Sequence, residues 1–261
     1  MSRKWTFLFF SFCLVLVLSG CEKKEAVDAA VQVETVSSEI KPAMGVDSAS
    51  AGTLKGKVIF DGQAPAPEKL SIAGNPECAV FHPGGSIVSE ELLVKNGALQ
   101  NVFVYVKEGL EGQSFPAPSE AVTINNKNCT YVPHVTGVQV NQPVNILNSD
   151  PTLHNVHSYS KNSKSWNLGL PFQGMKQTKK FDAPEVMVTL KCDVHPWMIG
   201  YLGVLGHPYF QVTGDGGEFE LKNLPPGKYV IEAWHEKLGV QTQTIELGHE
   251  ETKEIEFKFT G

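Results

Sequence analysis

The stretch CDVHPWM, residues 192–198, holds the side chains best suited to bind a metal. It spaces a thiol, an imidazole and a thioether three residues apart, in Cys192, His195 and Met198. A thiolate and a thioether with imidazole favour copper or zinc over magnesium or calcium. Methionine is a poor zinc ligand, and one thiolate, two imidazoles and an axial methionine form a mononuclear blue-copper centre. The stretch therefore supplies three ligands of a type 1 copper site.

The missing imidazole must come from another part of the chain. The candidate stretch is NSDPTLHNVHSY, residues 148–159, which follows a predicted strand and contains His154 and His157. These two histidines are an odd number of residues apart, so their side chains point to opposite faces of an extended chain. We expect only one of them to reach the site.

The cysteine count leaves one thiol for a metal. Cys13 lies in the N-terminal signal and Cys21 is the expected site of lipidation, so Cys78, Cys129 and Cys192 remain in the folded part. Free thiols tend to pair in an oxidising compartment, and three cannot all pair with one another. Because Cys192 has the metal-like neighbours, we predict a disulfide between Cys78 and Cys129. It would stabilise the fold by about 4 kcal/mol in the chain-entropy model.

The N-terminus indicates an exported protein. Residues 1–20 have a basic start and an uncharged apolar run, which is typical of a secretory signal. LSGC, residues 18–21, resembles the lipobox of bacterial lipoproteins, which implies cleavage before Cys21 and lipidation of its thiol. Residues 21–52 contain no aromatic side chain, so we expect a flexible tether. The expected location is the periplasmic side of a bacterial membrane, either inner or outer.

The charge of the chain restricts its partners. The formal net charge is −6, which argues against nucleic acid and anionic lipid and is compatible with a basic protein partner. The chain contains no phosphate-binding loop and no long basic run.

The segments that must position these residues are predicted to be strands. EVMVTLKC, residues 185–192, alternates so that Val186, Val188, Leu190 and Cys192 share one face, which points the thiol into a core. Gly (24) and Pro (16) mark frequent turns, so the pattern favours an all-β sandwich or a pair of sandwiches. The other predicted strands lie at 57–60, 101–107, 138–147 (two strands around a turn), 218–234 (two strands), 242–247 and 253–259.

Three stretches together carry a family resemblance. They are PHVTGVQVNQPVNILNSD (133–150), LHNVH (153–157) and CDVHPWM, with a proline directly after the histidine. From about residue 120 to 206 the chain resembles the cupredoxins, and within them the amicyanin- and plastocyanin-like proteins. The resemblance implies a Greek-key β-sandwich in which Asn155 braces the site near the thiolate. The copper ligands that it implies are His154, Cys192, His195 and Met198.

The resemblance also implies a function. In that family the loop histidine lies near the surface within an apolar patch through which electrons pass; here Pro196 and Trp197 would form part of that patch. Met198 as a weak axial ligand leaves no good position for a substrate, so we expect an electron carrier and not an enzyme. Its partner would be a redox protein such as a cytochrome or a periplasmic oxidoreductase. The alternatives are copper acquisition, delivery or storage, and a structural or interaction module.

A second resemblance concerns the flanking segments. VTGDGGEFELKNLPPGKYVIEAW, residues 212–234, resembles the carboxypeptidase regulatory-like (transthyretin-like) β-sandwich family, whose opening strand looks like residues 52–67. We therefore expect a discontinuous, smaller sandwich from 53–112 and 207–261, with the cupredoxin domain at 113–206 inserted into it. The alternative is one cupredoxin with terminal decorations. Pairing of the strand at 55–60 with C-terminal strands would distinguish the two.

Five further histidines are expected to have packed or hydrogen-bonded structural roles. A second metal site near His207 or His235 stays open at this point. The five residues are His82, His134, His157, His207 and His235.

Overall fold

The computed structural model describes residues 50–261, and nearly all of its regular structure is strand. The one helix among these residues is the short α1 (Pro76–Ala79). The all-β prediction is confirmed. The predicted signal at 1–20, the lipid attachment at Cys21 and most of the tether lie outside the described residues. Within residues 50–261, no helix is long and apolar enough to cross a membrane.

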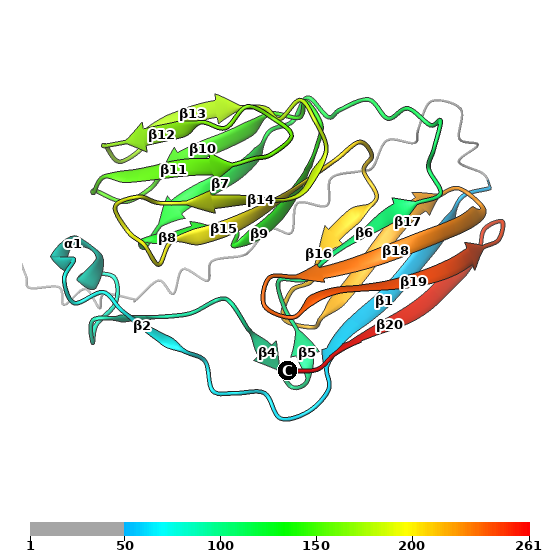
Figure 1. Cartoon of the computed structure of the whole chain (residues 1–261), viewed down its shortest axis with the longest axis horizontal. Coiled ribbons are helices and arrows are strands. Elements are labelled where there is room, and N and C mark those ends of the chain that lie inside the picture. The colour runs from blue at the N-terminus through cyan, green and yellow to red at the C-terminus, as the bar shows by residue number, and fades with distance from the viewer. Residues whose placement is uncertain (1–49) are drawn as a thin grey trace, which may run out of the picture. The chain divides into compact units, whose positions relative to one another are not determined.

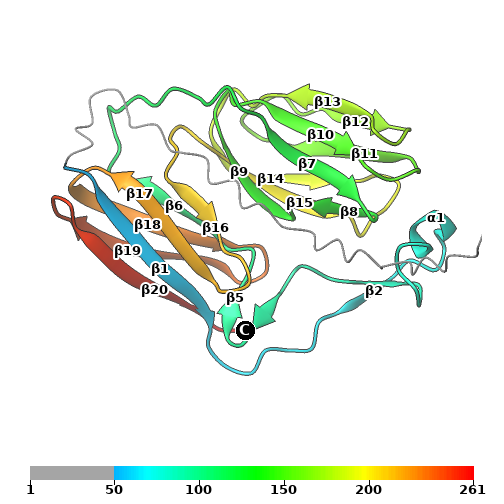
Figure 2. The same cartoon turned by 180° about the vertical axis from the view of Figure 1, so that it is seen from behind.

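Two sheets pack face to face around one core to form what we call the central sandwich (Figures 1 and 2). Both sheets contribute alternate apolar side chains to this core, such as Ile146 from one sheet and Leu202 from the other. One sheet has the order β13 (Lys176–Lys179), β10 (Val144–Asn148), β7 (Val122–Lys127), β8 (Thr130–Val132). The other has the order β12 (Asn167–Leu170), β11 (His154–Tyr159), β14 (Glu185–Lys191), β15 (Ile199–Leu205), β9 (Val135–Gln139).

Most of the remaining strands form a second pair of sheets, the flanking sandwich. This sandwich has its own core of residues such as Leu54, Ile231 and Phe257. One sheet has the order β17 (Glu218–Leu224), β1 (Gly52–Phe60), β5 (Ala98–Leu99), β4 (Val94–Lys95), and β20 (Thr252–Phe259) also pairs with β1. The other has the order β16 (Phe210–Val212), β6 (Phe103–Glu108), β18 (Gly227–His235), β19 (Gly239–Leu247). A separate hairpin pairs β2 (Lys69–Ser71) with β3 (Ser86–Val88).

The first strand of the described chain pairs with strands from its end. β1 runs antiparallel to β17, with Lys55 opposite Glu220, and parallel to β20 over eight residue pairs. In both views the blue β1 lies beside the red β20 (Figures 1 and 2). All strands of the central sandwich fall between β6 and β16 in the sequence.

The strand that leads to Cys192 departs from the predicted alternation at its start. A bulge between Glu185 and Val188 shifts the register of β14 against β15. Val188, Leu190 and Cys192 point into the central core, whereas Val186 packs on a separate cluster around Phe103. The prediction that Val186 shares the face of Cys192 is therefore wrong, because the extra residue of the bulge reverses the parity.

Candidate metal centre

The loop between β14 and β15 holds its three candidate ligands in a closed turn. The Cys192 N–H donates to the Met198 carbonyl at 3.1 Å, and the Met198 N–H donates to the His195 carbonyl at 2.9 Å. All three side chains are buried, with exposures of 3% for Cys192, 2% for His195 and 1% for Met198. The thiol therefore continues the buried face of β14, and the imidazole and thioether turn back toward the same core.

The sheet register brings a distant histidine to this loop. β11 pairs antiparallel with β14, with His157 opposite Lys191, so His154 lies beyond the end of β14 and alongside the loop. His154 is completely buried, and its Nδ1 lies 3.0 Å from the Nδ1 of His195. The Sγ of Cys192 lies 3.7 Å from the same His195 atom.

Three donor atoms thus converge on one point. The ligand atoms of His154, Cys192 and His195 all lie within 4.8 Å of one another. Metal–nitrogen and metal–sulfur bonds are about 2.0 to 2.3 Å long, so separations of this size suit a single ion between the donors. Met198 is buried in the same core cluster as Cys192, and its thioether would add a soft donor that suits copper. The residues present therefore fit the metal that the sequence implies.

The surroundings of Cys192 lower the pKa of its thiol. Burial by itself would raise its pKa, but the neighbouring His154 and His195 rings and hydrogen bonds from the backbone N–H groups of Asn155 and Val194 lower the pKa to about 6. A thiolate is the form that binds a metal. The site therefore favours the ligand form of the sulfur near neutral pH.

Asn155 connects the two segments that supply the ligands. Its Oδ1 accepts the backbone N–H of Asp193 at 2.7 Å and lies 3.3 Å from the Cys192 sulfur, which donates to it as a thiol. Its Nδ2 donates to Asn167 and to the Asp193 carboxylate. The side chain therefore ties β11 to the ligand loop beside the sulfur, as expected for a bracing residue.

Asp150 is a functional residue that the sequence reasoning missed. The Nε2–H of His154 donates to its Oδ2 at 2.9 Å, which leaves Nδ1 as the unprotonated atom facing the other donors. The carboxylate also accepts the backbone N–H groups of Asn128 and Cys129. Burial would raise the pKa of Asp150, but these hydrogen bonds hold it below its usual range. An acid four residues before the histidine, in DPTLH, was the available signal.

His157 lies away from the donor cluster. Its Nδ1 is 3.4 Å from an Asp193 carboxylate oxygen, and its ring stacks on Tyr159 with centroids 4.3 Å apart. The parity of β11 therefore assigns the two histidines to opposite faces, with His154 inside and His157 partly exposed.

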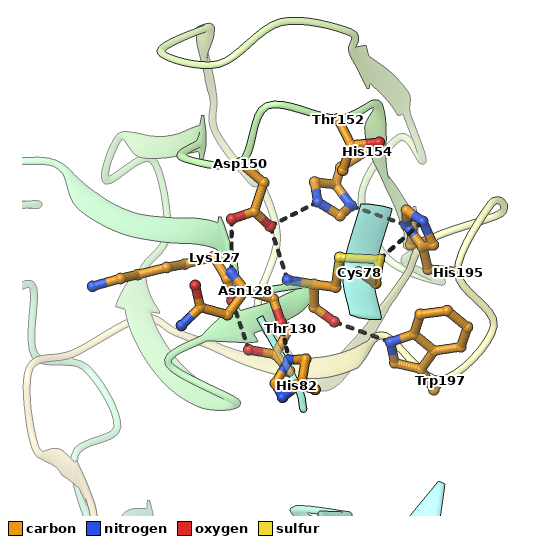
Figure 3. Close-up of a disulfide and its surroundings, with 12 residues drawn as sticks. Cys78, His82, Lys127, Asn128, Thr130, Asp150, Thr152, His154, His195 and Trp197 are labelled. Atoms are coloured by element: carbon orange, nitrogen blue, oxygen red, sulfur yellow. Dashed lines mark hydrogen bonds and ion pairs between the residues drawn. A yellow bond between two sulfur atoms is a disulfide. The ribbon is translucent and has the colours of Figure 1, made fainter. Parts of the chain in front are cut away.

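A disulfide joins Cys78 and Cys129 and covers the far edge of the loop histidine (Figure 3). The Sγ of Cys78 lies 3.5 Å from the Nε2 of His195. The expected surface position of His195 is therefore wrong for this chain, because the segment that carries α1 packs over the ring. Pro196 is exposed, whereas Trp197 is half-buried and its Nε1–H donates to the Cys129 carbonyl at 3.0 Å.

The remaining histidines have ordinary packing roles. His207 donates from Nε2 to the Val106 carbonyl, and His235 accepts backbone N–H groups at Nδ1. His134 pairs with Glu236, and His82 donates to the Asn128 carbonyl. Among the described residues, neither His207 nor His235 belongs to a group of three or more potential metal ligands that lie close together.

The comparisons with known proteins give alignments to solved structures over about a third of the chain. No protein-family model and no curated protein matches the chain. Among solved structures, the chain is similar to a copper-containing nitrite reductase from Thermus scotoductus SA-01 at 20% identity, covering 36% of this chain and 24% of that one, with a TM-score of 0.31. The chain thus spans about a quarter of the reductase.

Two smaller proteins give similar alignments. A mutant of amicyanin in its reduced Cu(I) form is 21% identical over 33% of this chain and 84% of its own, with a TM-score of 0.29. A purple cupredoxin from Nitrosopumilus maritimus is 26% identical over 32% of this chain and 97% of its own, with a TM-score of 0.27. The assignment of individual ligands rests on the geometry of the site.

Proposed function

We propose that this protein carries single electrons by means of one mononuclear copper ion bound by His154, Cys192, His195 and Met198. The observation that carries the proposal is the convergence of two imidazole nitrogens and one thiol sulfur, drawn from two segments, within 4.8 Å. A copper ion bound there would supply a centre that changes between Cu(I) and Cu(II). The chain's own residues hold the donor positions nearly fixed, because the ligands lie on paired strands and in a hydrogen-bonded turn.

The burial of the site supports electron transfer over catalysis. Each of the four side chains is at most 3% exposed, and Met198 would supply a fourth ligand where a catalytic site keeps a position open. No substrate reaches the donors without displacing packed side chains. We therefore propose that the chain is not an enzyme, and that a redox protein such as a cytochrome or a periplasmic oxidoreductase exchanges electrons with it.

The domain organisation and the location are part of the same proposal. A cupredoxin domain at 113–206 would be inserted into a carboxypeptidase regulatory-like sandwich formed by 53–112 and 207–261. The pairing of β1 with β17 and β20 supports this division. A lipid on Cys21 would hold the protein on the periplasmic side of a bacterial membrane.

Visible spectroscopy and voltammetry of the copper-loaded protein test the function. The oxidised protein should absorb strongly through thiolate-to-copper charge transfer and should cycle reversibly at one potential. Cys192→Ser should abolish the colour, and Met187→Leu, a methionine outside the donor set, should leave it unchanged. A colourless loaded protein, or one that releases copper on reduction, would contradict electron transfer.

Copper acquisition or delivery is the second candidate, and one observation favours it. The disulfide places two more sulfur atoms against the His195 ring, on the side opposite to Cys192. An electron carrier needs only the four ligands named above, whereas a protein that takes up copper gains from additional soft donors, which these two sulfurs become as thiolates when the disulfide is reduced.

A further inference from the structure

The imidazole of His195 lies between two sulfur groups. Its Nδ1 is 3.7 Å from the Cys192 sulfur. On its other side, Nε2 is 3.5 Å from the Cys78 sulfur of the disulfide (Figure 3). The ligand atoms of Cys78, Cys129 and His195 lie within 4.8 Å of one another, and the exposures of these residues are 0%, 0% and 2%. A second group of potential metal donors therefore adjoins the first. Its two sulfurs are bonded to each other in the disulfide and are not free to bind a metal.

We propose that reduction of the Cys78–Cys129 disulfide creates a second metal site, in which the two thiolates bind Cu(I) beside His195. The inference deepens the copper function proposed above and rests on it. Disulfide sulfurs are weak ligands, whereas thiolates are the soft donors that select Cu(I). Because Nδ1 of His195 faces the first site, Nε2 carries the ring proton and donates toward the Cys78 sulfur. The ligands of the new site are therefore the two thiolates.

The redox step is a thiol–disulfide exchange with a dithiol reductant. The reductant gives two electrons and two protons to the disulfide, and its own two sulfurs join as a disulfide. The sulfur–sulfur bond of this protein breaks, and one S–H group forms on Cys78 and one on Cys129. Binding of Cu(I) then displaces the two thiol protons, and no further oxidant or reductant is required.

The contacts that hold the backbone of Cys129 do not depend on the disulfide. Its backbone N–H donates to Asp150 at 2.8 Å, and its carbonyl accepts the Trp197 indole N–H at 3.0 Å. Asp150 in turn accepts from His154 of the first site. The second site would therefore share a hydrogen-bonded support with the first, and neither contact involves the sulfur.

The segment around α1 carries Cys78 and is held to the central sandwich by apolar packing on either side of the helix. Because α1 is short, it can open locally. Ile72 and Ile87 from either side of α1 lie in the central core, and Cys78 itself lies on the four-residue helix. Because both sulfurs are buried, a reductant reaches them through a local opening of α1. After reduction, burial of Ile72 and Ile87 in the central core favours closure of the segment. Closure places both thiols beside His195 again.

Copper counting on the full-length protein tests the proposal. The folded protein is treated with dithiothreitol, freed of it, and titrated with Cu(I) against a competing chelator, and bound metal is counted by native mass spectrometry. The oxidised form should bind one Cu(I) and the reduced form two. Cys192→Ser should bind none when oxidised and one when reduced, and a variant with Cys78→Ser and Cys129→Ser should bind one in both states.

The two proposals fail in different ways in this experiment. One Cu(I) in the reduced parent, or a disulfide that stays closed while the protein is folded, would overturn the second site and leave the first intact. Loss of binding in the oxidised parent would instead overturn the proposed function. If the double variant folds poorly, a measurement on the reduced parent protein replaces it. Bound Cu(I) should protect Cys78 and Cys129 from alkylation. Full alkylation of both cysteines in the presence of Cu(I) would overturn the proposal.

Discussion

The Nδ1 atoms of His154 and His195 lie 3.0 Å apart, although 41 positions separate the two residues in the chain. The pairing of β11 with β14 produces this approach, because it runs the start of one strand past the end of the other. Both rings are buried, at 0% exposure for His154 and 2% for His195, so neighbouring side chains restrict their movement. A metal would therefore meet donors that the strands already hold close together.

Asp150→Asn should weaken copper binding by about 10- to 100-fold, the usual cost of losing a carboxylate partner behind a ligating histidine. The amide no longer favours the tautomer of His154 that leaves Nδ1 free. Competition with a copper chelator measures the affinity, and the exposed Asp182→Asn is the control. An affinity equal to that of the parent would show that Asp150 does not position the ligand.

The Asp150 carboxylate also accepts hydrogen bonds from two backbone N–H groups, so its replacement is expected to lower the stability of the fold as well. Circular dichroism of the metal-free variant separates this effect from the loss of affinity. A variant that is folded at the assay temperature and binds copper weakly fits a positioning role.

His154→Ala and His157→Ala should differ completely in their effect on copper. The first removes a buried donor, so the thiolate-to-copper absorption should disappear. The second removes a partly exposed ring whose polar contact is with Asp193 at 3.4 Å, so the absorption should persist. The stability change for His157→Ala should stay within about 1 kcal/mol, as for most surface substitutions. Equal loss of colour in both variants would refute the assignment of faces.

The faces on which the candidate ligands lie could be predicted because local patterns encode them. Period-2 alternation placed Cys192 inside, and the odd spacing of His154 and His157 separated their faces. The register of β11 against β14 depends on these same buried positions, so a correct pattern nearly determines which histidine reaches the loop.

The cover over His195 could not be predicted, since its contact with Cys78 spans 117 residues and follows no periodic pattern. Residues 68–100 have few alternating apolar positions, and the structure forms only short elements there. Cysteine counting paired Cys78 with Cys129 but carried no information on where the bond would lie. The bulge at Val186 was hidden for a similar reason, because one extra residue changes parity without changing composition.

Gly203→Ala should destabilise the protein by about 1 to 3 kcal/mol through overpacking. A Cβ at Gly203 in β15 would overlap the ring of Phe103, which is fully buried and belongs to β6 of the flanking sandwich. Gly169→Ala is the matched control, because a Cβ there meets nothing within 4 Å. Urea unfolding of both variants measures the difference. Equal stabilities would show that the Phe103 ring moves aside without cost.

Acid should destabilise the fold partly through His207. Burial lowers the pKa of His207 to about 4, whereas an exposed histidine in the unfolded chain titrates near 6.5. Between these values the unfolded chain binds more protons, so the free energy of unfolding decreases as the pH falls. The stability contribution is complete above about pH 6.5 and is lost toward pH 4. At about 1.4 kcal/mol per pKa unit, the loss is about 3 kcal/mol.

His207→Gln should therefore reduce the stability difference between pH 7.5 and pH 4.5, although it costs stability at both values. The Val106 carbonyl and the Tyr209 N–H lose an imidazole partner in the variant, which explains the cost that is common to both. His235 has its pKa lowered to about 4 by burial as well, so part of the acid sensitivity should remain. Urea unfolding at the two pH values, with the exposed His249→Gln as control, measures the change. A pH dependence identical in His207→Gln and the parent would mean that the buried ring does not titrate on unfolding.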